Sequence, residues 1–531
     1  MSKFVSVWLS AGLAVALSAQ QPALHFDGES WWAHVKFVAD DSLEGRDTGS
    51  DGLKKAETYA VEQFQKAGLA PAGTDGFYQP VKLRQYQVDE KKSFIALITK
   101  GESRRFSFTD DAYISTRATH ASAGVTAPLV FVGYGLQIPE KHLDELGGLD
   151  LNGKIVVYLN GSPSDIPTAL ASHYQTLAER WKALHEAGAI GFISIPNPAS
   201  MDVPWSRIAL NHNQPSMDLA DAEFRETPGL DVGMVMNPAS AEKLFAGAAH
   251  SFTEIAQLGR DRKPLPAFPL ATSIHVAAAI VSKPVTSANL VAKLPGTDAK
   301  LKDEYVVLSA HIDHVGIGAP INGDNIYNGA MDDGSGTALV LDMAANLKAH
   351  PETLKRSVLF LLVTAEEKGL LGSKYFAAHP TVPIKSMVAD INVDMFLPIV
   401  PLKVLKIEGL EESSLGTQAA TIAKSLGVKP IADPEPLRNA FIRSDQYSFI
   451  KKGVPSVKMD IGFELGTPEQ KIFKEWLTNR YHAPSDDVNQ PVDLKAAALY
   501  EEIVRRLLIE TANQEARPQW NADSFFRRYG Q

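Results

Sequence analysis

The sequence predicts an α/β fold in which a mixed, mainly parallel sheet is covered by helices on both faces and a β-rich module is inserted. From about residue 286 onward, segments typical of strands and of helices alternate along the chain. The strand segments are apolar throughout, which is typical of strands buried on both faces. Between about residues 115 and 275, short β-rich runs bounded by glycine replace this alternation and indicate a separate module.

The chain begins with the pattern of a secretory signal peptide. Lys3 precedes an apolar stretch from about Phe4 to Leu17, and small residues follow it. The stretch is short for a bilayer span, and no second run of this kind occurs. We therefore expect residues 1–19 to direct export to the periplasm or beyond, without stable membrane insertion.

Residues 31–70 are predicted to form two helices separated by a glycine-rich loop. In the second helix Leu53, Ala56 and Ala60 recur at helical spacing, and Gly68 is a suitable C-terminal cap. We assign residues 20–114 to the N-terminal part of the main domain.

The predicted insert covers residues 115–275. Its strand-like runs are APLVFVGYG and GKIVVYLNG, and ERWKALHEAGAIGFISI follows as a helix, a glycine turn and a buried strand. The insert contains none of the charged residues singled out below, and it joins the chain at stretches that contain Pro and Gly, where insertions are tolerated. We therefore expect it to govern access to a site in the main domain and to take no part in the chemistry.

Residues 276–531 are predicted to complete the main domain. The expected strands are EYVVLSAHID, SVLFLLVTAEE, SMVADINVD and VPSVKMDIG, and the longest expected helices are GTALVLDMAANLKAH and DLKAAALYEEIVRRLLIETAN. In sheets of this kind, ligands bind outside the carboxyl ends of the strands. Several charged residues of this segment lie at those ends.

These charged residues follow three successive apolar strands or lie in two loops. They are His311 and Asp313, Glu366 and Glu367, Asp394, the turn residues Asp332 and Asp333, and the loop residue His482. Each has an ordinary structural explanation when taken alone, because acidic pairs are common on surfaces and Asp-Gly sequences are common in turns. Together they predict a metal site, because burying several carboxylates is costly without a cation.

The types and number of these residues indicate which metal they would bind. The two histidines together with three of these carboxylates would suit zinc or a similar divalent metal. Five ligating side chains exceed what one catalytic zinc uses. Two metals that share a bridging carboxylate, with a water between them, fit this number better.

The same residues carry a family resemblance. The motifs SAHIDHVG, NGAMDDGSG, TAEEKGLLGS, NVDMF, FIRSDQYSF and RYHAPSDD span about residues 308–487. In this order they resemble the zinc-dependent exopeptidases that include bacterial leucyl aminopeptidases, glutamate carboxypeptidase and, as a non-catalytic relative, the transferrin receptor. The resemblance implies the fold of that family, a zinc exopeptidase or phosphorylase/hydrolase-like fold. LVFVGYG, GKIVVYLNG and EAGAIGFISI resemble a protease-associated domain, which members of the family often carry as an insert.

The resemblance also implies a role for each site residue. Asp332 would bridge two zinc ions, with His311 and Asp394 completing one site and Glu367 and His482 the other. Glu366 would be the general base that takes a proton from the bridging water, and Asp313 would orient His311. Tyr481 would polarise the scissile carbonyl, and Arg443 would line the pocket for the substrate amine.

These roles imply an exported dinuclear zinc aminopeptidase that hydrolyses the N-terminal bond of peptides. Three alternatives stay open. A carboxypeptidase could use the same core, an aminoacyl cyclase of the glutaminyl type would use one metal, and a binding protein would have lost catalysis. The complete ligand sets argue against the cyclase, and the ligands together with Glu366 argue against the binding protein.

Composition and the remaining motifs exclude other classes of protein. The net charge of -10 argues against nucleic acid as the main partner, and the absence of cysteine excludes disulfides, thiolate zinc sites and a Cys nucleophile. Ser335 lacks the G-x-S-x-G elbow of a serine hydrolase, and DDGSG lacks the Lys of a P-loop. His314 follows the first motif closely, and we expect a structural role for it.

Overall fold

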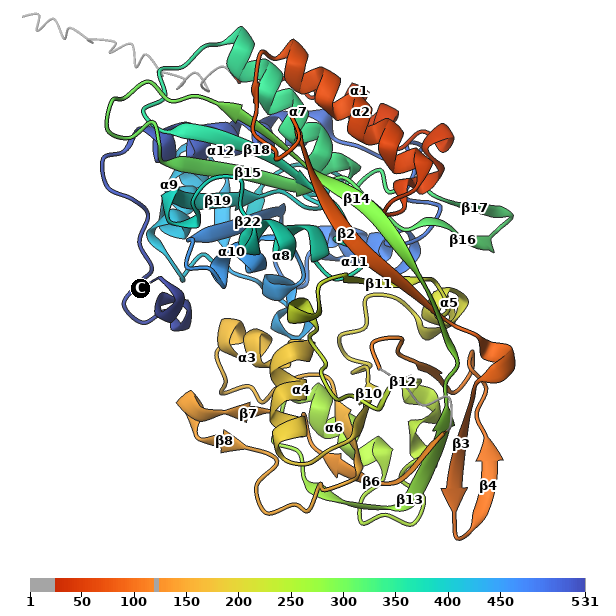
Figure 1. Cartoon of the computed structure of the whole chain (residues 1–531). Coiled ribbons are helices and arrows are strands. Elements are labelled where there is room, and N and C mark those ends of the chain that lie inside the picture. Colours follow the sequence, from red (N-terminus) through yellow and green to blue (C-terminus); the bar gives the residue numbers. More distant parts are fainter. Residues whose placement is uncertain (1–23, 119–123, 531) are drawn as a thin grey trace, which may run out of the picture.

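The computed structural model describes residues 24–118 and 124–530, which form two large sheets, each with its own helices (Figure 1). The predicted signal peptide lies outside the described residues. Within the described ranges, no helix is both long and apolar enough to cross a bilayer.

The first sheet has ten strands and forms the core of the main domain. Its order is β11-β2-β14-β18-β15-β19-β22-β20-β21, and β1 also pairs with β14. The bounds are β1 Ala70–Pro71, β2 Tyr78–Val88, β11 Ser216–Leu219, β14 Ile280–Leu294, β15 Tyr305–His311, β18 Ser357–Val363, β19 Met387–Asn392, β20 Val404–Glu408, β21 Lys429–Ile431 and β22 Ser456–Ile461.

The centre of this sheet follows the sequence prediction. Strands β18, β15, β19 and β22 pair in parallel, and every residue in them is buried. Strands β11, β2 and β14 add an antiparallel edge, so the sheet is mixed with less parallel pairing than the sequence indicated. Residues of β2 alternate between buried and exposed in its first half, which is typical of an antiparallel strand with one face toward solvent.

Helices cover both faces of the sheet, as predicted. Alternate residues of β15 face two different cores, with Val306 and Leu308 in one and Tyr305 and Val307 in the other. The larger core is closed mainly by α1 Glu29–Val38, α2 Asp51–Lys66, α7 Gly334–Ala349, α9 Ser414–Ser425, α11 Pro468–Asn479 and α12 Leu494–Asn513, and the smaller one by α8 Leu371–Ala378 and α10 Gln446–Ile450.

The second sheet has eight strands and belongs to the inserted module. Its order is β4-β3-β13-β6-β9-β10-β12-β5, and its helices are α3 Thr168–Gln175, α4 Leu177–Glu186 and α6 Phe252–Arg260. The strand bounds are β3 Phe94–Thr99, β4 Glu102–Arg105, β5 Ala112–Ile114, β6 Val125–Val132, β9 Ile155–Leu159, β10 Gly191–Ile195, β12 Val232–Met236 and β13 Ala267–Ala277.

This sheet starts at Phe94, earlier than the predicted module boundary at residue 115. The additional strands β3 and β4 form a hairpin whose turn contains Lys100 and Gly101, both with positive φ. Strand β4 is exposed along its whole length and contains Glu102 and two arginines. An exposed, charged edge strand has no apolar alternation, which explains why the sequence pattern did not reveal it.

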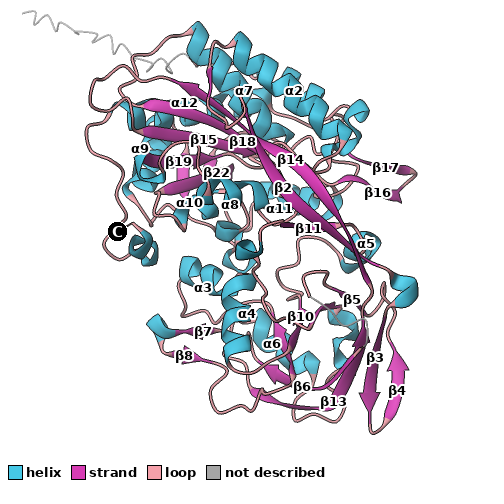
Figure 2. Cartoon of the chain, in the orientation of Figure 1, coloured by secondary structure: helices cyan, strands magenta, loops and turns pink. Residues whose placement is uncertain are grey.

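Two long strands, β2 and β14, pair along their length and run from the first sheet toward the module (Figure 2). The module in turn sends β11 back to pair with β2. Helix α5, Trp205–Asn211, precedes β11 in the chain and lies between the two parts. The two small hairpins are β7 Gln137–Ile138 with β8 Leu143–Asp144, and β16 Gly316–Ile321 with β17 Asp324–Tyr327.

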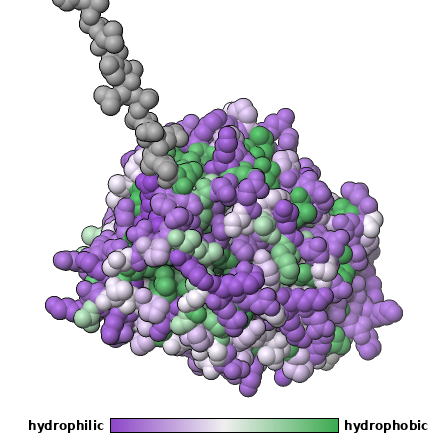
Figure 3. Space-filling view, turned by 90° about the horizontal axis from the view of Figure 1, so that it is seen from above, coloured by the Kyte–Doolittle hydropathy of each residue, from purple (hydrophilic) through white to green (hydrophobic). Residues whose placement is uncertain are grey.

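The outer face of the main domain is mostly hydrophilic. Seen from above, polar side chains cover most of it, and apolar side chains form only small areas between them (Figure 3).

Candidate metal centre

The ends of three neighbouring strands meet at the candidate site. Strand β15 ends at His311, and it pairs with β18 on one side and β19 on the other. Glu366 and Glu367 follow β18, and Asp394 follows β19. Because the three strands are parallel, their carboxyl ends lie at the same edge of the sheet, as the sequence predicted.

The first group of candidate ligands surrounds His311. Its Nε2 atom lies 3.3 Å from Asp332 Oδ1 and 3.8 Å from Asp394 Oδ1. Glu366 Oε2 lies 4.0 Å from the same nitrogen. His311, Asp332 and Asp394 are buried, and their ligand atoms are close enough to hold one metal ion.

The second group shares Asp332 with the first. His482 Nε2 lies 3.1 Å from Asp332 Oδ2 and 3.1 Å from Glu367 Oε2. His314 Nδ1 also lies here, 2.7 Å from Glu367 Oε1 and 3.9 Å from Asp332 Oδ2. The structure therefore brings together all five predicted ligands, and it adds a third histidine that the sequence analysis had set aside.

The electrostatics of the site reflect its crowded carboxylates. Burial raises the pKa of Glu366 well above its usual range, and the nearby Glu367 and Asp394 raise it further. Burial alone would lower the pKa of His311, but the surrounding carboxylates raise it well above the usual value. Burial alone would raise the pKa of Glu367, but His482 and His314 hold it well below its usual range. The site thus attracts positive charge, which a bound cation would supply.

The donor atoms fit zinc. Among the described residues, His311 Nε2, His314 Nδ1, Asp332 Oδ2 and Glu367 Oε1 are buried polar atoms that lie close to other donor atoms of the site but form no hydrogen bond of normal geometry. Buried polar atoms are ordinarily satisfied, so a cluster of unsatisfied nitrogen and carboxylate donors indicates a missing partner. Imidazole and carboxylate donors suit zinc.

Asp313 connects the ends of two strands. Its Oδ1 atom accepts a hydrogen bond from the backbone N–H of Glu366 (3.2 Å), and its Oδ2 atom accepts one from the Thr48 hydroxyl (2.9 Å). Its Oδ1 atom also lies 3.9 Å from His311 Nδ1, whereas its own carbonyl oxygen lies 3.1 Å from that nitrogen. These contacts fix the ring of His311 and the backbone of Glu366 relative to each other.

Two further acidic residues hold the Asp332 turn. Asp486 accepts hydrogen bonds from the backbone N–H groups of Met331 and Asp332. Asp333, which follows a cis peptide bond, accepts hydrogen bonds from the backbone N–H groups of Gly336 and Met395. Both residues lie inside the motifs NGAMDDGSG and RYHAPSDD, but their roles were not predicted from the sequence.

Arg46 is a supporting residue that the sequence did not reveal. It lies in the 3₁₀ helix Asp41–Arg46 and is buried. Its guanidinium donates to the carbonyl oxygens of Ile312 (3.0 Å), Asn328 (2.6 Å) and Gly329 (3.1 Å), which flank His311 and the Asp332 turn. Burial lowers the pKa of Arg46 to about 10, while nearby aspartates oppose this shift.

Arg46→Met is expected to lower the free energy of unfolding by about 3 kcal/mol or more, because several buried carbonyl oxygens lose their donor. The urea midpoint, measured with an unchanged m-value, tests this. Lys54→Met, at an exposed site one helix away, is the control and should leave the midpoint unchanged. A wild-type midpoint for Arg46→Met would contradict this role.

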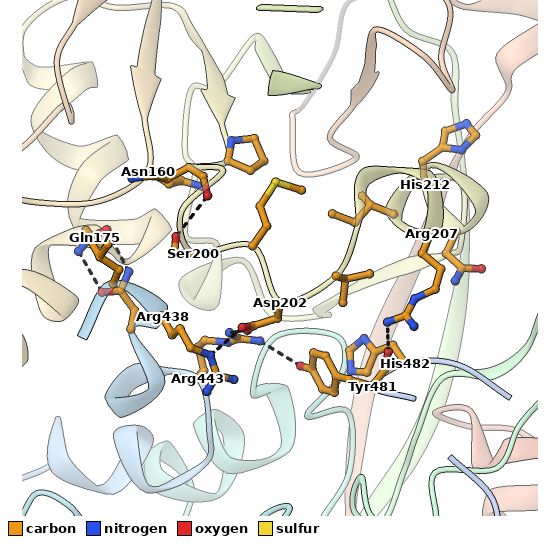
Figure 4. A pocket seen from close by; sticks show the side chains of 18 of the residues that line it. Asn160, Gln175, Ser200, Asp202, Arg207, His212, Arg438, Arg443, Tyr481 and His482 are labelled. Atoms are coloured by element: carbon orange, nitrogen blue, oxygen red, sulfur yellow. Dashed lines mark hydrogen bonds and ion pairs between the residues drawn. The ribbon is translucent and has the colours of Figure 1, made fainter. Parts of the chain in front are cut away.

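A cavity of about 550 Å³ between the module and the main domain reaches the site at Tyr481 and His482 (Figure 4). Arg443 lines it, donating from Nη2 to the Tyr481 hydroxyl (3.1 Å) and from Nη1 to Asp202 of the module (2.7 Å). Asp202 also accepts a hydrogen bond from Arg438 (2.6 Å). Burial alone would raise the pKa of Asp202, but the two guanidinium groups hold it at about 2.

Comparison with known proteins relates this geometry to a family. Over 243 residues the chain is 27% identical to Aminopeptidase YwaD of Bacillus subtilis (strain 168), which covers 43% of this chain and 48% of that protein. Over 372 residues it is 23% identical to Carboxypeptidase Q of Homo sapiens, which covers 67% of this chain and 63% of that protein. The chain therefore matches about half to two thirds of the length of these relatives.

A solved structure shares the fold. The aminopeptidase from Aneurinibacillus sp. strain AM-1 superposes with a TM-score of 0.56 at 20% identity, over 93% of this chain and 95% of that one. Peptidase family M28 matches residues 289–508, the segment that contains every predicted site residue. This segment is therefore similar to peptidase family M28.

Proposed function

We propose that this chain is a dinuclear zinc exopeptidase that acts as an aminopeptidase on the N-terminal bond of peptides. The observation that carries the proposal is the convergence of two histidines and three carboxylates on the shared Asp332, with Glu366 beside them. The match of residues 289–508 to peptidase family M28 and the similarity to YwaD, which is named an aminopeptidase, support it.

We assign the ligands of the two metals as the motifs imply. His311 and Asp394 would hold one zinc, Glu367 and His482 would hold the other, and Asp332 would contribute to both. Of the two histidines near Glu367, His482 is the partly exposed one beside the cavity, whereas His314 is fully buried. We therefore assign His314 to orienting Glu367 from behind, a role in which it supports a ligand without binding substrate.

The chemistry follows from these positions. Zinc bound here would supply Lewis-acid activation of a water and of the scissile carbonyl. Glu366, held by the hydrogen bond of its backbone N–H to Asp313, accepts a proton from the attacking water and passes it to the leaving amine. The Tyr481 hydroxyl donates to the carbonyl oxygen as that oxygen gains negative charge.

A second pocket suggests where the first side chain of the substrate binds. It has a volume of about 90 Å³ and lies beside Asp394 and Tyr481. Phe463, Phe473 and Leu477 contribute apolar walls to it. We propose that this pocket accepts an apolar side chain, because burying apolar surface against such walls is favourable.

The cations near the site bear on which end of the peptide is recognised. Arg443, which contacts Tyr481, is already paired with Asp202. One observation nevertheless favours a carboxypeptidase as the second candidate. Arg180 lines the larger cavity, is buried, and has no hydrogen-bond partner for Nε or Nη2 within the described part of the chain, so it could take a terminal carboxylate.

A peptide screen separates the two candidates. We expect the free tripeptide Leu-Gly-Gly and its C-terminal amide to be cleaved at similar rates, because an aminopeptidase recognises the amine end. N-acetylation should reduce cleavage to the detection limit. The opposite pattern, in which the acetylated peptide is cleaved and the amide is not, would establish a carboxypeptidase instead.

Two parts of the sequence interpretation stay predictions. Residues 1–19 are proposed to direct export. The eight-stranded module is proposed to be a protease-associated domain, with the resemblance of its strand motifs as support.

A further inference from the structure

We propose that the inserted module completes the active site, because its residues Arg207 and Asp202 hold the Tyr481–His482 turn in its working position. The proposal rests on the assignment of His482 as a zinc ligand and of Tyr481 as a donor to the substrate carbonyl. It replaces our expectation that the module only governs access.

Arg207 holds the backbone of this turn. It lies in helix α5 of the module, and its side chain reaches across to the main domain. Its Nη1 donates to the carbonyl oxygen of Thr478 (2.6 Å), and its Nη2 donates to those of Leu477 (3.3 Å) and Tyr481 (2.5 Å). The Tyr481 carbonyl belongs to the peptide bond that leads directly into His482.

The acceptors explain why an arginine suits this position. Leu477 and Thr478 lie in the last turn of α11, where carbonyl oxygens lack partners within the helix. A positive charge at a helix C-terminus also interacts favourably with the helix dipole. One planar guanidinium therefore satisfies the helix end and ties the following residues to it.

His482 has a conformation that requires such support. Its φ is 50°, in the left-handed region that non-glycine residues rarely adopt. Conformations of this kind persist where the surrounding structure holds them. Arg207 is 9% exposed and provides that hold from outside the main domain.

Asp202 acts on the side chain of Tyr481 through Arg443. Its carboxylate accepts from Arg443 Nη1, and Arg443 Nη2 donates to the Tyr481 hydroxyl oxygen (Figure 4). Because this oxygen already accepts a hydrogen bond, the hydroxyl hydrogen is free to point elsewhere and becomes a stronger donor. Arg438 on the other side of Asp202 fixes the carboxylate.

Loss of Arg207 and loss of Asp202 are expected to have different effects. Arg207 acts on the backbone that carries a ligand, so its loss should weaken zinc binding. Asp202 acts on Tyr481, so its loss should leave zinc binding unchanged and slow the reaction. Neither is a catalytic residue, because neither touches the proposed ligand atoms or the substrate carbonyl.

Zinc competition titrations of the full chain test Arg207. Arg207→Met should bind one of the two zinc ions ~10–100-fold more weakly, the usual cost of removing a residue that supports a ligand. His482→Ala, measured in parallel, should weaken the same binding step. Arg207→Lys should fall between Arg207→Met and wild type. Ser206→Ala, at the exposed neighbouring position, is the matched control and should bind as wild type.

Steady-state kinetics with a small chromogenic amino-acid substrate test Asp202. Asp202→Asn should bind zinc as wild type and lower kcat ~10-fold with little change in KM. In a Tyr481→Phe background the same substitution should have no further effect, because its path runs through the Tyr481 hydroxyl. Asp221→Asn, at an exposed position of the module, is the control.

The outcomes distinguish the inference from the proposed function. If wild-type protein bound no zinc, the proposed function would fail. Suppose that wild type binds two zinc ions. The Arg207 role would be overturned if Arg207→Met bound both ions with wild-type affinity. It would also be overturned if this variant bound both ions equally weakly and had a lower unfolding temperature. An equal loss of kcat from Asp202→Asn in both backgrounds would overturn the Asp202 role.

Discussion

Glu366→Gln is expected to leave the protein folded and loaded with zinc while reducing peptide hydrolysis by ~10²–10⁴-fold or more, the range for a placed proton-transfer group. Gln has nearly the same shape as Glu but cannot accept the proton of the attacking water. Glu366 Oε2 lies 4.0 Å from His311 Nε2, beside the proposed ligands. The backbone N–H that binds Asp313 is unchanged by the substitution. Metal content, circular dichroism and kcat should be measured on the same preparation.

Glu367→Gln is the matched control, because the same chemical change falls on the adjacent residue. Glu367 Oε2 lies 3.1 Å from His482 Nε2, and we assign it to ligation. This variant should therefore lose zinc as well as activity. If metal content fell in Glu366→Gln and not in Glu367→Gln, the roles of the two glutamates would be reversed.

Removal of the metal is expected to abolish hydrolysis, and the purified protein should contain about two zinc ions per chain, as in other two-metal sites. The physical reason is that buried donor atoms of the described residues, among them His311 Nε2 and Asp332 Oδ2, converge here without hydrogen bonds of normal geometry. Dialysis against a chelator followed by stepwise return of zinc should recover activity as occupancy rises. Turnover at the wild-type rate in stringently metal-free protein would contradict the assignment of a catalytic zinc site.

Stability provides an independent measure of metal binding. A ligand that binds only the folded state raises stability with its concentration. Zinc should therefore raise the unfolding temperature of metal-free wild type. Asp332→Asn should reduce this increase most strongly, because Asp332 lies in both groups of candidate ligands. An unfolding temperature that did not respond to zinc would contradict the buried site.

The sequence was sufficient to predict the centre of the fold. Strands β15, β18 and β19 are apolar along their whole length, and helices separate them in the chain. Such strands are buried on both faces, so they pair with each other and their polar ends meet at one edge. This local information was enough to group His311, Glu366, Glu367 and Asp394. His482 lies on a loop with no such periodicity, and its place in the site came from the motif resemblance.

Only the tertiary structure revealed the residues that hold this site in place. Arg46, Asp202 and Arg207 lie outside the family motifs, and their partners are hundreds of residues away in the chain. Arg46 and Arg207 donate to backbone carbonyl oxygens, which every residue type provides, so no sequence pattern marks the acceptor. The pairing of strand β11 with the first sheet was also not predictable from the sequence. This strand is short, and its register depends on β2. The sequence by itself therefore determined which side chains could perform the chemistry. The packing of the module against the main domain decided how Tyr481 and His482 are held, because that contact joins residues that lie far apart in the chain.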